Sequence, residues 1–199
     1  MGDVPHDTHT RRGTFAVTIQ ATSSPKPTGP LALAFLAVLQ DSTGWLGGYL
    51  VTNGWGRPLE FRLTTAVQPN RVQSALYGPT LVEYLHADVI GKTLVEKTAT
   101  KPDLIVTDCL PALALRARIE IPVIALAPPT GTLTETVPFA HPRSSVGLLL
   151  PGRFASDRDA VAQLLERVDP AVDLAEPFAR IREAVGEARK MGVTNRAAA

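Results

Sequence analysis

The sequence predicts an α/β fold with a mixed five-stranded sheet and elements in the order βββαβαβα. Three observations support this prediction. Strand-like segments follow one another up to residue 65, and apolar residues then recur about every 3.6 residues between positions 70 and 97. Two short segments without polar alternation come next, at 103–108 and 121–127. Apolar residues make up 45% of the 199-residue chain, which is enough for a substantial core.

The first three strands are predicted to form an antiparallel meander. They are expected at residues 33–40, 45–53 and 57–65. Asp41-Ser42-Thr43-Gly44 is typical of the first turn, and Asn53-Gly54 is a strong signal for the second hairpin. In the third strand Leu59, Phe61 and Leu63 alternate with polar residues, so we expect them on a buried face. Gly47 and Gly48 indicate a bulge or a close backbone approach.

Helices and buried strands fill the rest of the chain. Helices are expected at 70–97 with a break at Gly78-Pro79, at 110–120, at 156–168 and at 174–189, and a further strand at 146–152. The strands at 103–108 and 121–127 lack polar alternation, as parallel strands buried on both faces do. Residues 1–30 are expected to be a flexible leader, in which 13–21 could add an edge strand. Residues 31–192 then form the single domain, and 193–199 a flexible tail.

Composition excludes several classes of protein. Twenty Lys and Arg residues balance 19 Asp and Glu residues, so the net charge of +1 does not indicate nucleic-acid or membrane binding. A local basic face stays open. One cysteine, Cys109, permits neither an intrachain disulfide nor a cysteine zinc site and fits the cytoplasm. The apolar run 31–39 is too short to span a bilayer as a helix, so no membrane association is expected.

The order of elements from Leu33 onward resembles the ribonuclease H-like superfamily, as a likeness of topology alone. Enzymes of this superfamily use a carboxylate cluster to hold two divalent metal ions, which stabilise the attacking and leaving oxygens of a phosphodiester. The resemblance implies Mg²⁺ or Mn²⁺ for an active nuclease. It also implies acids at the middle of the first strand, on the first helix, at the tip of the fourth strand and on the last helix.

Asp108 matches the tip of the fourth strand in this resemblance. Glu83 or Asp88 could serve from the first helix, and the remaining acid could come from Asp157, Asp159 or Glu166. The first strand has no acid, because Asp41 lies at the turn, roughly 7 Å beyond the strand centre. Metal ligation tolerates errors of only tenths of an ångström. A non-catalytic version of the fold, without a cofactor, is therefore favoured.

Asp108 and Cys109 have two readings. They could be a metal ligand and a nucleophile, or Asp108 could cap the helix that starts near Pro111 while Cys109 packs as a small buried residue. No histidine lies nearby in sequence to activate the thiol, although the fold could bring one. We favour the cap.

Gly91-Lys92-Thr93 matches only the tail of a phosphate-binding loop. The leading glycine position holds His86, and the preceding residues have a helical pattern. Nucleotide hydrolysis is therefore not expected. A lone histidine such as His86 or His141 is more typical of a surface or capped group than of a ligand.

Aromatic residues gather on the predicted hairpins at Trp45, Tyr49, Trp55 and Phe61. Phe61 and Tyr49 are expected in the core, whereas Trp55, between two glycines at a hairpin tip, is hard to bury. A protein partner is therefore expected at Trp55, Arg57 and Trp45.

Three functions follow from these patterns. The preferred one is a non-catalytic binding or scaffolding subunit that acts with a protein partner. The second is a divergent metal-dependent nuclease that uses Asp108 with Glu83, Asp88 or Asp159. The third is a small-ligand-binding domain, with its site at the C-terminal ends of the strands at 103–108 and 121–127.

Overall fold

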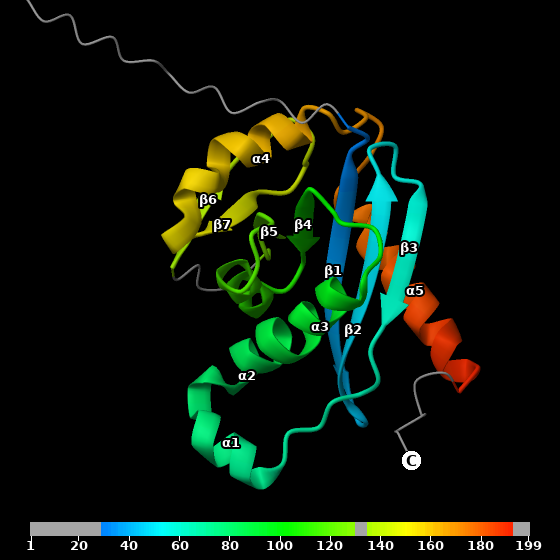
Figure 1. The fold of residues 1–199 in the computed structure, drawn as a ribbon, viewed down its shortest axis with the longest axis vertical. Helices are drawn as coiled ribbons and strands as arrows, with labels where there is room; N and C mark the ends of the chain where they lie inside the picture. The colour runs from blue at the N-terminus through cyan, green and yellow to red at the C-terminus, as the bar shows by residue number, and fades with distance from the viewer. Residues whose placement is uncertain (1–28, 130–134, 193–199) are drawn as a thin grey trace, which may run out of the picture.

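A seven-stranded mixed sheet lies between two layers of helices in the computed structural model, which describes residues 29–129 and 135–192 (Figure 1). The strands are β1 (Ala32–Asp41), β2 (Gly44–Asn53), β3 (Pro58–Leu63), β4 (Leu104–Thr107), β5 (Val123–Leu126), β6 (Thr136–Phe139) and β7 (Leu148–Pro151). Their order across the sheet is β3-β2-β1-β4-β5-β7-β6. β1 and β4 are parallel, as are β4 and β5, which confirms the expectation drawn from their unbroken apolar runs.

The prediction of five strands is wrong, because β6 and β7 form an antiparallel hairpin that extends the sheet beyond β5. Each of these strands has four residues, too few to show a clear period in the sequence. β6 also contains Pro138, which favours a loop or an edge strand, and β6 is the edge strand here. β7 lies within the strand predicted at 146–152, and β6 lies in the segment that precedes it.

The helical elements mostly follow the predicted boundaries. They are α1 (Arg71–Tyr77), η1 (Gly78–Thr80), α2 (Leu81–Glu83), η2 (Tyr84–Gly91), α3 (Lys92–Lys97), η3 (Leu110–Ala117), η4 (Gly152–Asp157), α4 (Arg158–Leu165) and α5 (Glu176–Lys190). A capping box between Asn70 and Gln73 starts α1, and Gly78, at a φ of 49°, ends it. The segment 110–117 forms a 3₁₀-helix rather than an α-helix.

The segment η2 is a π-helix that continues through Gly91 into α3. A Cβ at Gly91 would lie 2.8 Å from the carbonyl oxygen of His86, so only glycine fits this wide turn without a shift of the backbone. Gly91 therefore shapes the helix rather than ending it. The three residues 91–93 lie inside helical segments, and they do not form a phosphate-binding loop.

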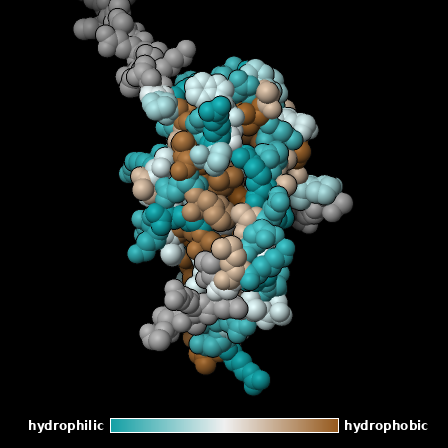
Figure 2. All heavy atoms as spheres, turned by 90° about the vertical axis from the view of Figure 1, so that its right-hand side faces the viewer, coloured by the Kyte–Doolittle hydropathy of each residue, from teal (hydrophilic) through white to brown (hydrophobic). Residues whose placement is uncertain are grey.

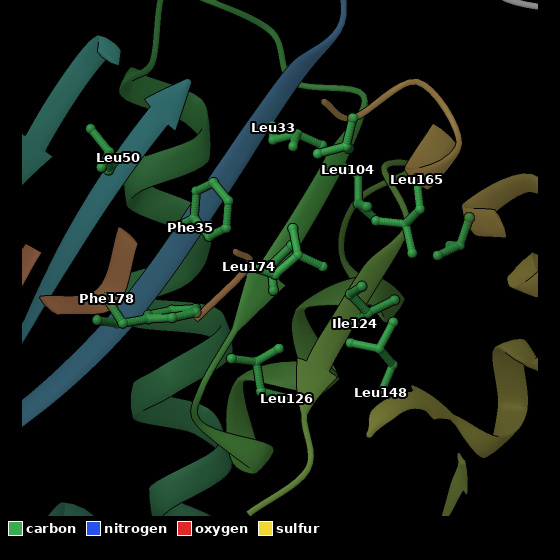
Figure 3. Close-up of a cluster of buried hydrophobic side chains, with 14 of the residues drawn as sticks. Leu33, Phe35, Leu50, Leu104, Ile124, Leu126, Leu148, Leu165, Leu174 and Phe178 are labelled. Carbon is green, nitrogen blue, oxygen red and sulfur yellow. The ribbon is translucent and has the colours of Figure 1, made fainter. Parts of the chain in front are cut away.

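The sheet has two apolar faces, and β1 contributes to both. Leu33 and Phe35 point toward α4 and α5, whereas Ala34 and Leu36 point toward η2, α3 and η3. Figure 3 shows the first face, where the Phe35 and Phe178 rings meet edge to face with centroids 5.7 Å apart. The buried face predicted for the last helix is confirmed at Phe178, Ile181 and Val185.

Two glycines of β2 let helices approach the sheet from both sides. A Cβ at Gly47 would lie 2.2 Å from Ile90 Cγ2, and a Cβ at Gly48 would lie 2.4 Å from Ile181 Cγ2. The close backbone approach expected at these glycines is confirmed, and it holds η2 and α5 against opposite faces of one strand. No helix within residues 29–129 and 135–192 combines the length and apolarity needed to cross a membrane.

Candidate functional site

The C-terminal end of β4 lies beside the middle of β1, because Leu36 pairs with Thr107 in the parallel ladder. Asp108 follows β4 directly, and its carboxylate forms an ion pair with Arg182 of α5. The prediction that Asp108 caps the next helix is wrong: Cys109 occupies the N-cap of η3, and no side chain caps it. Pro111 in the first turn lacks an N–H, so this helix start has one donor fewer to satisfy.

The second acid at this end of the sheet is neutralised in the same way. Asp41, the last residue of β1, forms an ion pair with Arg189 of α5 and accepts a 2.7 Å hydrogen bond from the backbone N–H of Thr43. Arg182 and Arg189 lie seven residues apart, which places them on the same face of the helix. The protein therefore supplies its own cations to both carboxylates.

The other acids considered as metal ligands lie apart from Asp108. The Asp88 carboxylate accepts a 2.7 Å hydrogen bond from Arg118. Glu83 is exposed on α2, and Asp159 is exposed in the first turn of α4. In the part of the chain that the structure describes, no group of three or more His, Cys, Asp or Glu side chains is placed to hold a metal ion. The described residues thus do not assemble the donor set that the nuclease alternative requires.

Cys109 has a histidine partner that sequence reasoning missed. Its Sγ lies 3.2 Å from Nδ1 of His86, which lies 23 residues earlier in the chain. The π-helix turns His86 inward, where it is 2% exposed and its ring meets Trp45 edge-on at a centroid distance of 4.8 Å. The spacing of apolar residues does not distinguish a π-helix from an α-helix, so it could not predict that His86 turns inward. In the sequence, only the adjacent Asp108 and Cys109 indicated that this part of the protein could hold a functional site.

The Cys109–His86 pair is neutral at physiological pH. Burial raises the pKa of the Cys109 thiol to about 12, and the neighbouring Asp108 adds to this effect. Burial lowers the pKa of His86 to about 4. Because the thiolate is the nucleophilic form of cysteine, a neutral thiol hydrogen-bonded to a neutral imidazole is a packed polar pair rather than an activated nucleophile.

A cavity of about 360 Å³ lies between η3 and η4. Leu110, Leu113 and Phe154 supply apolar walls, and Glu83 and Arg153 supply charge. This volume is at the lower end of the range for small-molecule sites. The cavity adjoins the end of β4 through Leu110, which partly matches the position expected for a small ligand.

At the other end of β2, the hairpin to β3 presents Trp55 to solvent. Oδ1 of Asn53 accepts hydrogen bonds of 3.0 Å from the backbone N–H groups of both Trp55 and Arg57, and Gly56 has a φ of 74°. This tight turn leaves Trp55 71% exposed. Trp45 lies at the opposite end of the ten-residue strand, roughly 30 Å away on strand geometry. Trp45 therefore does not share a surface with Trp55 and Arg57.

The burial of β3 differs from the prediction at two of its three apolar residues, whereas Leu63 is partly buried against the core. Leu59 and Phe61 are 51% and 39% exposed, whereas the carboxylate of Glu60 accepts backbone hydrogen bonds from Ala99 and Thr100 at 3.0 and 2.9 Å. These hydrogen bonds lower the pKa of Glu60 to about 2, and the bond from Thr100 has the largest effect. The loop after α3 covers the polar face of β3, and α5 packs mainly on β1 and β2, so the apolar face of β3 stays partly open.

We call Trp55, Leu59 and Phe61 the open-edge surface. Figure 2 views the molecule from the side of β3 and α5 and shows apolar residues in a band between hydrophilic ones along this face. Tyr49 is fully buried, as expected, but Phe61 is not. Sequence reasoning identified Trp55 but missed Leu59 and Phe61, because their alternation with polar residues is also the pattern of a buried face.

No protein-family model matches the chain, and no curated protein matches it either. Functional inference therefore depends on the geometry of the two ends of the sheet. One end pairs its acids, its thiol and its imidazole within the protein. The other leaves large apolar side chains in solvent.

Proposed function

We propose that this domain is a non-catalytic binding or scaffolding subunit that holds a protein partner on the open-edge surface. One observation carries the proposal: Trp55 stays 71% exposed on a turn that two hydrogen bonds to Asn53 hold in place. A large aromatic side chain that is exposed on an ordered turn is typical of the anchor residues of protein interfaces. Exposed Arg57 lies beside it and adds a second residue type that is common at such interfaces.

The fold proposal is a ribonuclease H-like topology. The order β3-β2-β1-β4-β5 supports it, together with the antiparallel β1–β2 and β2–β3 pairs and the parallel β1–β4 and β4–β5 pairs. The β7–β6 hairpin would be an addition at the outer edge of β5. We place the domain in the cytoplasm, since its one cysteine, Cys109, is a free thiol paired with His86.

The chemistry of the open edge indicates the class of partner. β3 is the last strand on its side of the sheet within the described residues, and Leu59 and Phe61 line one face of it. A partner segment in extended conformation could add its own backbone hydrogen bonds to this edge and place apolar side chains beside Leu59 and Phe61. We therefore propose a partner with an exposed strand or an extended apolar segment.

The test is a quantitative pull-down with purified wild-type protein and three variants. We expect Trp55→Ala and Phe61→Asp to lose the same set of captured proteins. Leu76→Ala is the matched control, because Leu76 is 80% exposed on α1 and is not part of the open-edge surface. An unchanged partner set in Trp55→Ala and Phe61→Asp would contradict the proposal.

The nuclease alternative keeps one supporting observation, because Asp108 does follow the fourth strand directly, although Asp41 lies four residues, roughly 13 Å, beyond the β1 position opposite Asp108. Calorimetric titration of Mg²⁺ and Mn²⁺ into wild type and Asp108→Asn separates the two functions. We expect no saturable heat in either protein, because Arg182 and Arg189 already neutralise these carboxylates. Saturable binding to wild type that Asp108→Asn abolishes would favour the nuclease and overturn the proposal.

The small-ligand alternative is supported by the cavity of about 360 Å³ beside η3. Its mixed lining, with Glu83 and Arg153 around Leu113, fits a small amphipathic molecule rather than a large cofactor. Thermal-shift measurements against a metabolite collection, repeated with Leu113→Phe to fill the cavity, test this alternative. A ligand that stabilises wild type but not the filled variant would establish it.

A further inference from the structure

The arginines of this protein differ in whether a carboxylate neutralises them. Within residues 29–129 and 135–192, the arginines that form ion pairs with carboxylates are Arg62, Arg116, Arg118, Arg180, Arg182 and Arg189. The other described arginines are exposed, except Arg143 and Arg167, which are half-buried. A half-buried guanidinium has lost part of its hydration, and here it lacks the carboxylate that would compensate for this loss.

Both of these arginines line one cavity beside Trp55. The cavity has a volume of about 440 Å³ and is formed by the start of β1, the turn from β2 to β3 and the segment after α4, which lie together in Figure 1. The edge strand considered at 13–21, the rest of the leader up to residue 28 and the tail at 193–199 lie outside the described residues. All of the residues that line the cavity lie within them.

Hydrogen bonds hold the walls of this cavity together. The backbone N–H of Asp169 donates to the carbonyl of Gly54 at 2.9 Å, which fixes the segment after α4 to the hairpin. The guanidinium of Arg167 donates through Nη2 to the carbonyl of Gly29, which places this cation at the cavity wall. The cavity is therefore formed before a ligand arrives, so binding requires little reordering of the protein.

The two guanidinium groups have donors that no acceptor satisfies. Nε of Arg143 and Nη1 of Arg167 are buried without a hydrogen-bond partner among the described residues. A buried donor on a charged group that lacks an acceptor lowers the stability of the protein. The charge is delocalised over all three nitrogens, so an oxyanion that contacts any of them stabilises the whole cation. The cavity therefore favours a ligand with an oxyanion.

The acids that line the same cavity have other contacts. The Glu166 carboxylate lies 3.5 Å from Nε2 of the buried His141, and Oδ1 of Asp169 accepts a 2.9 Å hydrogen bond from the backbone of its own turn. No ion pair joins either acid to Arg143 or Arg167 in the described part of the chain. The two acids nevertheless repel a ligand with many negative charges. The cavity therefore favours a single carboxylate over a polyanion such as a nucleic acid.

We propose that this cavity binds a carboxylate side chain, Asp or Glu, of the protein partner through Arg143 and Arg167. Trp55 belongs both to the cavity and to the open-edge surface. A partner segment that lies beside Leu59 and Phe61 and continues past the start of β3 would therefore place its acid in the cavity. This inference rests on the proposed function, because it names the chemistry by which the same partner is recognised.

The first test uses a display library of random nonapeptides and the purified full-length chain, so that the sequence of the partner is not needed. We expect wild type to select peptides with Asp or Glu at one fixed position next to an apolar residue. Arg143→Gln should select peptides without this preference. A wild-type selection with no preferred acid, or no selected peptide at all, would overturn the inference.

Calorimetric titration of one selected peptide, with both termini blocked, measures the contribution of the carboxylate. Replacement of its acid by the neutral amide should weaken binding to wild type about tenfold or more, because a hydrogen bond to a charged group is lost. The same replacement should have little effect on binding to Arg143→Gln, which lacks the cation. Equal affinities of wild type for the acidic and the amide peptide would overturn the inference.

Arg158→Gln is the matched control, because Arg158 is exposed and lines neither cavity. It should bind the acidic peptide as wild type does. A loss in Arg158→Gln as large as that in Arg143→Gln would overturn the inference, since the effect would then come from net charge. Tighter binding of oligothymidine or of the phosphothreonine peptide than of the acidic peptide, abolished in Arg143→Gln, would also overturn it in favour of a phosphate ligand.

The pull-down described above separates failure of this inference from failure of the proposed function. If both hold, Arg143→Gln should capture less of the Trp55-dependent partners than wild type does. Trp55-dependent capture that Arg143→Gln leaves unchanged, with equal binding of the acidic and amide peptides, would overturn the carboxylate site alone. Acid-dependent peptide binding without any Trp55-dependent capture would overturn the proposed function but not the carboxylate site.

Discussion

The two tryptophans of this protein lie at opposite ends of β2 and have opposite environments. Trp45 packs against the ring of His86 at one end of the strand. Trp55 lies on the turn at the other end, where it is 71% exposed. β2 thus connects an end where the tryptophan is packed, which we call the closed end, with an end where the tryptophan is exposed, which we call the open end. The open end is the better candidate for a binding surface.

The closed end shows how a position suited to chemistry can become structural. Asp108 and Asp41 each pair with an arginine of α5, and the Cys109 thiol pairs with a neutral imidazole. Each of these groups has a partner inside the protein, although the imidazole is paired only through Nδ1 and its buried Nε2 has no hydrogen-bond partner among the described residues. At the open edge, by contrast, Leu59 and Phe61 are only partly covered, because the helices of that face pack on β1 and β2. The exposed apolar surface of this hairpin is therefore the feature to which the proposed partner would bind.

Replacement of the two tryptophans gives the largest expected effect. Trp45→Ala should lower the free energy of unfolding by about 3 kcal/mol, because it leaves a cavity against His86 and the sheet. Trp55→Ala should change it by less than about 0.5 kcal/mol, since its side chain is mostly in solvent. Urea unfolding of both variants measures the difference. Equal losses would mean that the two ends of β2 do not differ as described.

The pH dependence of stability tests the buried imidazole. Because burial lowers the pKa of His86 to about 4, the unfolded chain binds a proton at this residue between about pH 6.5 and pH 4 that the folded chain does not. The free energy of unfolding should therefore fall as the pH falls through this window, by roughly 2 kcal/mol at pH 4.5.

His86→Gln keeps a hydrogen-bonding side chain near Cys109 but cannot titrate. The variant should lose this part of the pH dependence and approach wild type in stability near pH 4. Parallel stability curves for wild type and His86→Gln from pH 7 to pH 4 would show that the imidazole is not held neutral.

The smallest expected effect concerns the polar face of β3. Glu60→Gln should cost about 1 kcal/mol at pH 7, because a neutral amide accepts the bonds from Ala99 and Thr100 more weakly than a carboxylate does. The pKa of Glu60 is held at about 2, below its unfolded value, so its contribution is complete above about pH 4.3 and is lost as the pH falls toward 2.

Chemical denaturation of wild type and Glu60→Gln at pH 7 and at pH 2 measures this contribution. The difference between them should be present at pH 7 and small at pH 2. Glu96→Gln is a suitable control, since Glu96 is exposed and lies 3.8 Å from Lys92 without backbone donors. A difference that persists unchanged at pH 2 would show that Glu60 does not act as a carboxylate acceptor.

Local patterns in the sequence predicted much of the fold. Asn53-Gly54 identified the second hairpin, Gly78-Pro79 the helix break, and the spacing of Phe178, Ile181 and Val185 the buried face of α5. Each of these signals arises within a few neighbouring residues, where backbone preference or periodicity acts directly. β7 lies within the strand predicted at 146–152, whereas the four residues of β6 barely define a period.

The candidate site depended on contacts that no local pattern contains. Arg182 meets Asp108 across 74 positions of the chain, and His86 meets Cys109 across 23. Sequence reasoning placed Asp108 at a strand tip but assigned its carboxylate to the wrong partner, a nearby helix start. A cap is the commonest local use of such an aspartate, and the ion pair with α5 exists only after the helix packs on the sheet.

The sequence by itself determined which segments are strands and helices, and which strands are buried on both faces, because these properties follow from backbone preferences and from the period of apolar residues. Only the tertiary structure decided which surfaces remain open. Leu59 and Phe61 have the alternation of a buried face, yet they are exposed because β3 is an edge strand and α5 packs mainly on its neighbours. Exposure is a property of how elements are arranged, and residues distant in sequence set that arrangement.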